Sequence, residues 1–184
     1  MKTRVIAFLV ADEGIEQVEL TEPWQAVIDA GGTPKLLSTV EAGETVQAFE
    51  HLTAHDRFTV DTIVGQANVQ DYDGLVLPGG VANPDALRLN SAAVEFVKEF
   101  TEAGKPIAAV CHAAWTLIEA GVVQGKTLTS WPSLATDLKN AGAADWVDQE
   151  VFVCPVNGWT LVSSRSPNDL PAFNRALVKE FGLG

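Results

Sequence analysis

The chain has 184 residues, of which 47% are hydrophobic and 20% are charged, so it is long enough to bury a full core and is expected to form a single domain over residues 1–184. Its 12 Lys and Arg residues against 24 Asp and Glu residues give a formal net charge of -12, which argues against nucleic acid and anionic membranes as partners. Two cysteines do not indicate a disulfide framework and fit a reducing cytoplasm, and no apolar segment approaches the roughly 20 residues that span a bilayer.

The N-terminal segment combines a basic start with an apolar stretch, as a secretory signal does, but the stretch is short and runs directly into acidic residues. A buried first strand at Val5 to Val10 explains it better. A helix is expected next, because apolar residues recur at helical spacing before Gly31 and Gly32, which are natural helix stops. The apolar positions of this helix are Val18, Leu20, Trp24, Val27 and Ile28.

The middle of the chain continues the alternation of strands and helices. A polar segment, Glu41 to Asp61, predicts a small hairpin outside the main sheet. Leu75 to Leu77 and Ile107 to Val110 are continuous apolar runs, typical of parallel strands that are covered on both faces. Between them, a helix is expected from its apolar residues, which are Val94, Phe96, Val97 and Phe100. The pattern predicts an α/β fold with a central, mainly parallel sheet.

The C-terminal part predicts a β-hairpin followed by a helix. The segments VFVCPV and WTLVSS are separated by Asn157 and Gly158, the pair favoured in a two-residue turn, while Pro155 favours an edge position. Asn168 or Ser166 is the expected cap of the last helix. The apolar face of this helix consists of Leu170, Phe173, Leu177 and Phe181.

Cys111 and His112 stand where the run Ile107 to Val110 gives way to a helix-prone segment. A parallel strand that turns tightly into a helix exposes one side chain at the carboxyl edge of the sheet, and Ala109 and Ala113 keep such an elbow compact. Free N–H groups and the helix dipole favour a thiolate there, so Cys111 is a candidate nucleophile. The alternative is a small residue that is simply buried.

A glycine turn ends the segment GLVLPGG and brings backbone N–H groups to the same edge. The N–H groups of Gly80 and His112 are therefore a candidate oxyanion hole, although a tight turn alone also explains the glycines. Adjacent side chains diverge at a turn, so a direct proton transfer from Cys111 to His112 is not assured. Asp85 is a candidate acid to orient the histidine, or else it only begins a helix.

Three carboxylates, Glu16, Glu19 and Glu22, follow the first strand at a helical spacing of three. One interpretation is that one of these carboxylates reaches the thiol. The alternative is that all three are solvated charges near a helix start. Three scattered histidines and two distant cysteines predict no metal site.

The chain resembles the ThiJ/PfpI superfamily, and specifically the PfpI-like branch of intracellular proteases and general stress proteins. The resemblance covers nearly the whole chain in ordered segments. These are IEQVELTEP (15 to 23), LVLPGGVANPDALR (75 to 88), GKPIAAVCHAAW (104 to 115), TLTSWP (127 to 132), NAGAADWVDQEV (140 to 151) and SSRSPNDL (163 to 170).

The resemblance implies a flavodoxin-like α/β sandwich with helices on both faces, related to class I glutamine amidotransferases. It implies that Cys111 pairs with Glu19, with Glu16 as a neighbouring acid of the site, and that Asp85 approaches His112 across a subunit interface. The chain departs from the pattern in its CHAAW and SWP segments, where Trp115 narrows the pocket and Trp131 replaces a tyrosine. No histidine follows His112, which argues against amidotransferase activity.

The function expected from the family is that of a cytoplasmic stress protein with no cofactor and a homo-oligomeric state, most simply a homodimer. Its substrates are expected to be small reactive carbonyl compounds or their peptide and protein adducts, processed by glyoxalase, deglycase or PfpI-type peptidase (hydrolase) chemistry. The alternative is a redox sensor or chaperone-like stress protein, in which Cys111 is oxidised under oxidative stress and little turnover occurs.

Overall fold

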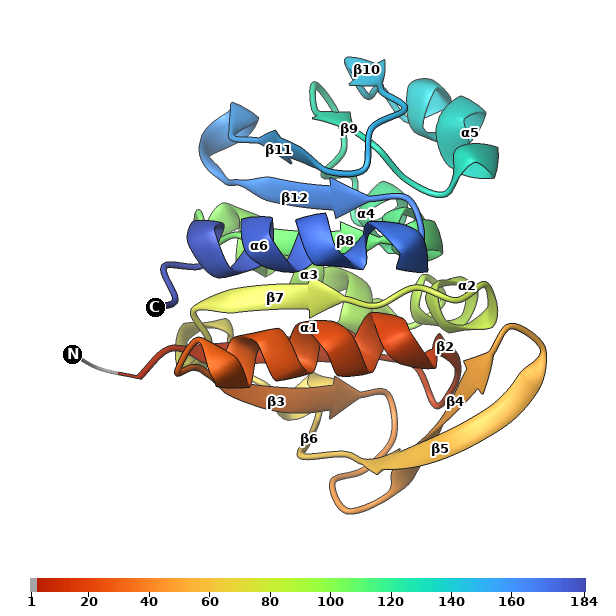
Figure 1. Cartoon of the computed structure of the whole chain (residues 1–184), viewed down its shortest axis with the longest axis vertical. Helices are drawn as coiled ribbons and strands as arrows, with labels where there is room; N and C mark the ends of the chain where they lie inside the picture. The colour runs from red at the N-terminus through yellow and green to blue at the C-terminus, as the bar shows by residue number, and fades with distance from the viewer. Residues whose placement is uncertain (1–2) are drawn as a thin grey trace.

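The computed structural model describes residues 3–184, and its centre is a sheet of seven strands (Figure 1). All neighbouring strands are parallel except the pair at the C-terminal edge. In order across the sheet, the strands are β11 (Phe152–Cys154), β12 (Leu161–Ser164), β8 (Ile107–Val110), β7 (Gly74–Leu77), β1 (Val5–Val10), β3 (Thr33–Ser38) and β6 (Thr62–Ile63). The mainly parallel sheet and its three buried apolar strands, β1, β7 and β8, are confirmed.

Helices cover both faces of this sheet, as Figure 1 shows, and each face has its own apolar core. Alternate residues of β1 point to opposite sides: Ala7 and Leu9 face the layer of α3 and α4, while Phe8 and Val10 face α1 and α6. The helices are α1 (Gln17–Asp29), α2 (Ala82–Leu87), α3 (Ser91–Glu102), α4 (Ala114–Glu119), α5 (Ala135–Asn140) and α6 (Leu170–Glu180). Within residues 3–184, none of them is long and apolar enough to cross a membrane.

Short elements complete the chain. A second sheet joins β2 (Glu13–Glu16), β4 (Thr45–Glu50) and β5 (Thr53–Thr59), and its β4–β5 hairpin extends beyond the carboxyl ends of the central strands (Figure 1). This confirms the hairpin predicted at Glu41 to Asp61. Two strands, β9 (Thr127–Leu128) and β10 (Asp145–Trp146), pair separately. The single 3-10 turns are η1 (Val64–Gln66), η2 (Val69–Asp71), η3 (Cys111–Ala113), η4 (Pro132–Leu134), η5 (Val156–Gly158) and η6 (Pro167–Asp169).

The C-terminal hairpin is present with β11 at the edge of the sheet, but the predicted two-residue turn is wrong. Cys154 pairs with Leu161, so residues 155–160 form a wider loop, in which Asn157 adopts a left-handed conformation (φ 66°) inside η5. The predicted cap of α6 is also wrong, since neither Asn168 nor Ser166 gives it a side-chain cap.

Lys126 explains the wide loop. Its side chain is buried, and its ammonium group donates hydrogen bonds to the carbonyl oxygens of Cys154, Val156 and Trp159. The same nitrogen lies 3.8 Å from the centroid of the Trp159 ring. Burial lowers the pKa of Lys126 to about 8, so the charged form with its three donors still prevails at neutral pH. The wide loop supplies two of these acceptors, the carbonyl oxygens of Val156 and Trp159.

Replacement of Lys126 by methionine is expected to lower the free energy of unfolding by about 3 kcal/mol, because the buried carbonyl oxygens lose their donor. The control is Lys98→Met on the exposed face of α3, where the ammonium makes surface ion pairs with Glu95 and Glu102, and a change below about 0.5 kcal/mol is expected. Urea unfolding of both variants measures the difference, and equal values would contradict the role given to Lys126.

Candidate active site

The turn after β8 places Cys111 at the carboxyl edge of the sheet. Cys111 adopts a left-handed backbone conformation (φ 63°), which is strained for a residue with a side chain. The carbonyl oxygen of Cys111 accepts a hydrogen bond from the backbone N–H of Trp131 (3.1 Å), which holds this conformation. η3 and α4 then follow directly, so the strand, turn and helix form the elbow that the sequence predicts.

The side chains of Cys111 and His112 contact each other: the distance from Sγ to Nδ1 is 3.1 Å. The expectation that adjacent side chains diverge at the turn is therefore wrong. The left-handed conformation of Cys111 is the reason, because it removes the alternation that an extended backbone would impose. Burial lowers the pKa of His112, which favours the neutral ring and leaves Nδ1 able to accept the thiol proton.

Glu19 of α1 is completely buried beside the thiol. Its Oε2 accepts a hydrogen bond from the N–H of Gly79 (2.8 Å), whereas Oε1 has no hydrogen-bond partner among the described residues. Burial, and then the neighbouring charge of Glu16, raise the pKa of Glu19 to about 8, although the N–H groups of Gly79 and Gly80 act in the opposite direction. Glu19 is therefore largely protonated at neutral pH.

Burial also raises the pKa of the Cys111 thiol, with a further contribution from the charge of Glu19. The expectation that the helix start favours the thiolate is wrong for this resting state, because α4 is short and the sulfur is desolvated. The backbone N–H groups of His112 and Gly80 lower this pKa in turn. Both groups are therefore near the sulfur, and the oxyanion hole at Gly80 and His112 stays a prediction.

The turn after β7 requires glycine because a side chain would have no space there. Gly80 has a φ of 82°, and a Cβ there would lie 2.1 Å from the carbonyl oxygen of Gly14. Asn83, which the sequence analysis missed, fixes this turn: its buried side chain accepts from the N–H of Ala11 (2.7 Å) and donates to the carbonyl oxygens of Pro78 and Gly79 (both 3.0 Å). In the sequence, the only indication of this role was that Asn83 is a polar residue one helical turn after the glycines.

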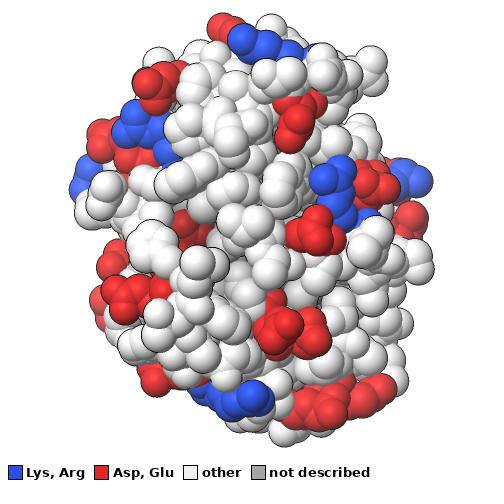
Figure 2. Space-filling model, turned by 90° about the vertical axis from the view of Figure 1, so that its right-hand side faces the viewer, with Lys and Arg blue, Asp and Glu red and all other residues white. Residues whose placement is uncertain are grey.

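The remaining predicted residues surround a pocket of about 760 Å³ at this edge. Figure 2 views this face, whose centre consists mainly of uncharged groups with acidic side chains scattered over it. Among the described residues, the pocket is lined by no lysine or arginine. Its polar and aromatic lining includes Glu13, Glu16, Glu19, His51, Asp85, Cys111, His112, Trp115 and Trp131.

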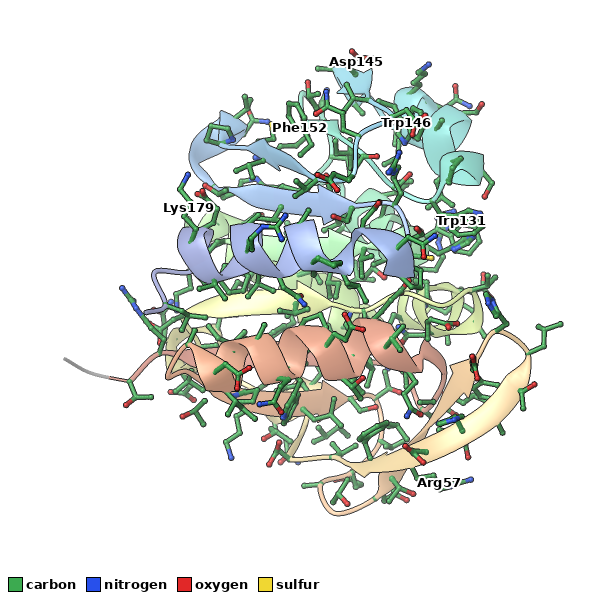
Figure 3. The ribbon with its side chains drawn as sticks, viewed as in Figure 1. Arg57, Trp131, Asp145, Trp146, Phe152 and Lys179 are labelled. Carbon is green, nitrogen blue, oxygen red and sulfur yellow. The ribbon has the colours of Figure 1, made fainter. Side chains whose placement is uncertain are left out.

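Asp85 lies on α2 and is exposed at this pocket, with no hydrogen bond to His112 within residues 3–184. Glu16 accepts a hydrogen bond from the N–H of His51 (3.1 Å), which joins the tip of the β4–β5 hairpin to the site. Trp115 and Trp131 both contact the His112 ring. In Figure 3 the labelled Trp131 lies at the carboxyl edge of the sheet. No group of three potential metal ligands occurs in the described part of the chain.

Comparison with known proteins gives close matches over the whole chain. The model of the DJ-1/PfpI family matches residues 4–180. General stress protein 18 of Bacillus subtilis is 40% identical over 160 residues, which are 87% of this chain and 88% of that protein. Protein/nucleic acid deglycase 2 of Escherichia coli is 38% identical over 182 residues, which are 98% of this chain and 99% of that protein.

Solved structures are similar over the same length. A two-domain protein from Anabaena variabilis, with DJ-1/ThiJ/PfpI-like and ferritin-like domains, has a TM-score of 0.88 and 31% identity over 99% of this chain, which spans 49% of that longer chain. Drosophila melanogaster DJ-1beta has a TM-score of 0.82 and 27% identity over 98% of this chain and 92% of its own. These findings agree with the fold and with the stress-response and deglycase functions that the sequence predicts.

Replacement of Glu16 by glutamine is expected to lower the pKa of Glu19 from about 8 towards its ordinary value, because it removes a nearby negative charge. Burial remains, so the pKa should stay above 4.5. Carbon-detected NMR titration of the glutamate carboxyl groups measures the shift. Glu13→Gln, on the same pocket, is the matched control, and an equal shift in both variants would contradict a specific effect of Glu16.

Proposed function

The chain belongs to the DJ-1/PfpI family, and on that basis we propose that it is a cysteine-dependent enzyme that converts α-oxoaldehydes such as methylglyoxal into 2-hydroxy acids. The observation that carries the proposal is the contact of the Cys111 thiol with His112 (3.1 Å) beside the buried Glu19. These groups supply a nucleophile, a base that takes its proton and a carboxyl group whose pKa of about 8 lies near the working pH.

In the first step, Cys111 attacks the aldehyde carbon of the substrate. The S–H proton passes to Nδ1 of His112 as the C–S bond forms, and the π electrons of the carbonyl move to its oxygen. The N–H groups of Gly80 and His112, which lower the pKa of the thiol, are the donors that we propose to stabilise this oxyanion. Return of the proton from the imidazolium to the oxygen gives a hemithioacetal.

In the second step, the ionised fraction of Glu19 removes the hydrogen of the former aldehyde carbon as a proton, and the electron pair moves onto the neighbouring ketone oxygen to form an enediolate. Glu19 returns this proton to the former ketone carbon, while the hydroxyl proton of the former aldehyde carbon moves to the former ketone oxygen, which leaves a thioester of the hydroxy acid. Water then cleaves the C–S bond, releasing lactate from methylglyoxal and restoring the thiol. One carbon is oxidised while its neighbour is reduced, so the reaction needs no external oxidant and no cofactor.

The same steps apply to carbonyl adducts of amino groups. There the sulfur replaces the amine at the former aldehyde carbon, the C–N bond breaks, and the amine leaves with a proton. The relative named as a protein/nucleic acid deglycase supports adducts as substrates. The net charge of -12 opposes tight binding of nucleic acid as such. We extend to this chain the single-domain, homo-oligomeric and cytoplasmic character that the family resemblance implies.

Replacement of Cys111 by alanine is expected to reduce kcat/KM for lactate formation from methylglyoxal by about a thousandfold or more, because the nucleophile is lost. The matched control is Cys154→Ala, since Cys154 is also buried but lies outside the pocket, and its kcat/KM should stay within about twofold of the unchanged protein. Equal lactate yields from Cys111→Ala and the unchanged protein would refute the proposed enzyme.

A redox-sensing role is the second candidate, and the position of Glu19 favours it. A protonated carboxyl group beside Cys111, together with the N–H groups of Gly80 and His112, would stabilise a sulfinate formed from the thiol by peroxide.

Mild peroxide treatment, followed by mass spectrometry of both cysteine peptides, is expected to show oxidation of Cys111 well before that of Cys154, because only Cys111 lines the pocket. In Glu19→Leu, the sulfinate of Cys111 loses its stabilising carboxyl group, so Cys111 should no longer be oxidised to the sulfinate before Cys154. Equal oxidation of the two cysteines would rule the sensor out.

A further inference from the structure

The imidazole ring of His112 lies between two indole rings. The ring of Trp131 is nearly parallel to it, with a centroid distance of 5.5 Å and an interplanar angle of 24°. The ring of Trp115 meets it edge-on, with a centroid distance of 5.1 Å and an angle of 64°. His112 is 7% exposed, so the two tryptophans form much of its surroundings.

Each tryptophan has a hydrogen bond of its own within the chain. The backbone N–H of Trp131 donates to the carbonyl oxygen of Cys111, so this tryptophan is anchored on the elbow itself. The Nε1–H of Trp115 donates to the carboxylate of Asp137 (3.2 Å), and the guanidinium of Arg88 lies 5.9 Å from the centroid of the Trp115 ring. These contacts all lie within one chain.

We propose that Trp131 and Trp115 are positioning residues that hold His112 against the Cys111 thiol and stabilise the imidazolium, so that one chain assembles the reactive pair without an acid from a second subunit. An aromatic face attracts a cation within about 6 Å of its centroid, so transfer of the thiol proton to His112 is favoured next to the stacked Trp131 ring. This inference concerns the thiol itself and does not depend on the proposed substrate.

The charged groups around the pair fit this role. Glu19 and Glu16 lie on the side of the thiol, and His51 and Asp85 line the pocket. The cation of Arg88 is paired with Glu119 (3.2 Å), which reduces its repulsion of an imidazolium. The carboxylate of Asp137 accepts from Trp115 and thereby makes that indole more electron-rich.

The test is the rate at which iodoacetamide alkylates Cys111 between pH 5 and pH 10, resolved from Cys154 by mass spectrometry. This rate follows the thiolate population of the Cys111–His112 pair. Trp131→Leu is expected to lower the rate at neutral pH about tenfold and to move the profile up by about one pH unit. Trp131→Phe keeps an aromatic face and should restore the rate to within about twofold of the unchanged protein.

Two comparisons decide the outcome. Trp24→Leu removes an indole that packs on Phe8 and not on His112, and it should leave the profile in place. Asp85→Asn should lower the rate less than Trp131→Leu does. Trp131→Met replaces Trp131→Leu where the latter does not fold by circular dichroism. A larger loss in Asp85→Asn than in Trp131→Leu, or equal rates in Trp131→Leu and Trp131→Phe, would overturn the proposal.

Discussion

The thiol and the buried acid of this protein approach each other because Gly79 has no side chain. A Cβ at this position would lie 2.3 Å from Oε2 of Glu19, 2.7 Å from Cβ of Cys111 and 2.8 Å from the carbonyl oxygen of Val110. Three elements, α1, the end of β8 and the turn after β7, therefore meet at one backbone position. Parallel strands bring their carboxyl ends to the same edge, so the sheet supplies the site directly. Any side chain at Gly79 would separate the acid from the sulfur.

Burial at this meeting point sets the chemistry of the site as well as its geometry. A carboxylate without water is unfavourable, and this holds the proton on Glu19 up to a pKa of about 8. The same burial disfavours the thiolate of Cys111 and the charged form of His112. The group formed by Cys111, His112 and Glu19 is therefore close to neutral at rest, and charges develop on it only as protons move. In the proposed mechanism, the backbone N–H groups of Gly80 and His112 stabilise the oxyanion and the indole rings stabilise the imidazolium.

The sequence predicts those parts of the structure that depend on local pattern. Continuous apolar runs locate the buried strands, and the change from strand to helix locates the elbow at Cys111. The contact between Cys111 and His112 was not predictable, because it depends on one backbone torsion that tertiary hydrogen bonds hold. Asn83 and Lys126 were missed for a related reason: each bonds to a backbone atom that lies far from it in sequence, at Ala11 and Trp159 respectively. Such partners cannot be predicted from residue type and spacing.

The pocket combines aromatic walls with acidic residues and has no lysine or arginine among its described lining residues. A neutral oxoaldehyde meets no electrostatic barrier there, whereas the hydroxy acid that the proposed reaction forms carries a carboxylate. Glu16 and Asp85 line the pocket with charge of the same sign as this product and repel it. The acidic lining thus acts differently on substrate and product, and it favours release once the chemistry is complete. The aromatic groups that hold His112 leave this electrostatic asymmetry intact, because they carry no net charge.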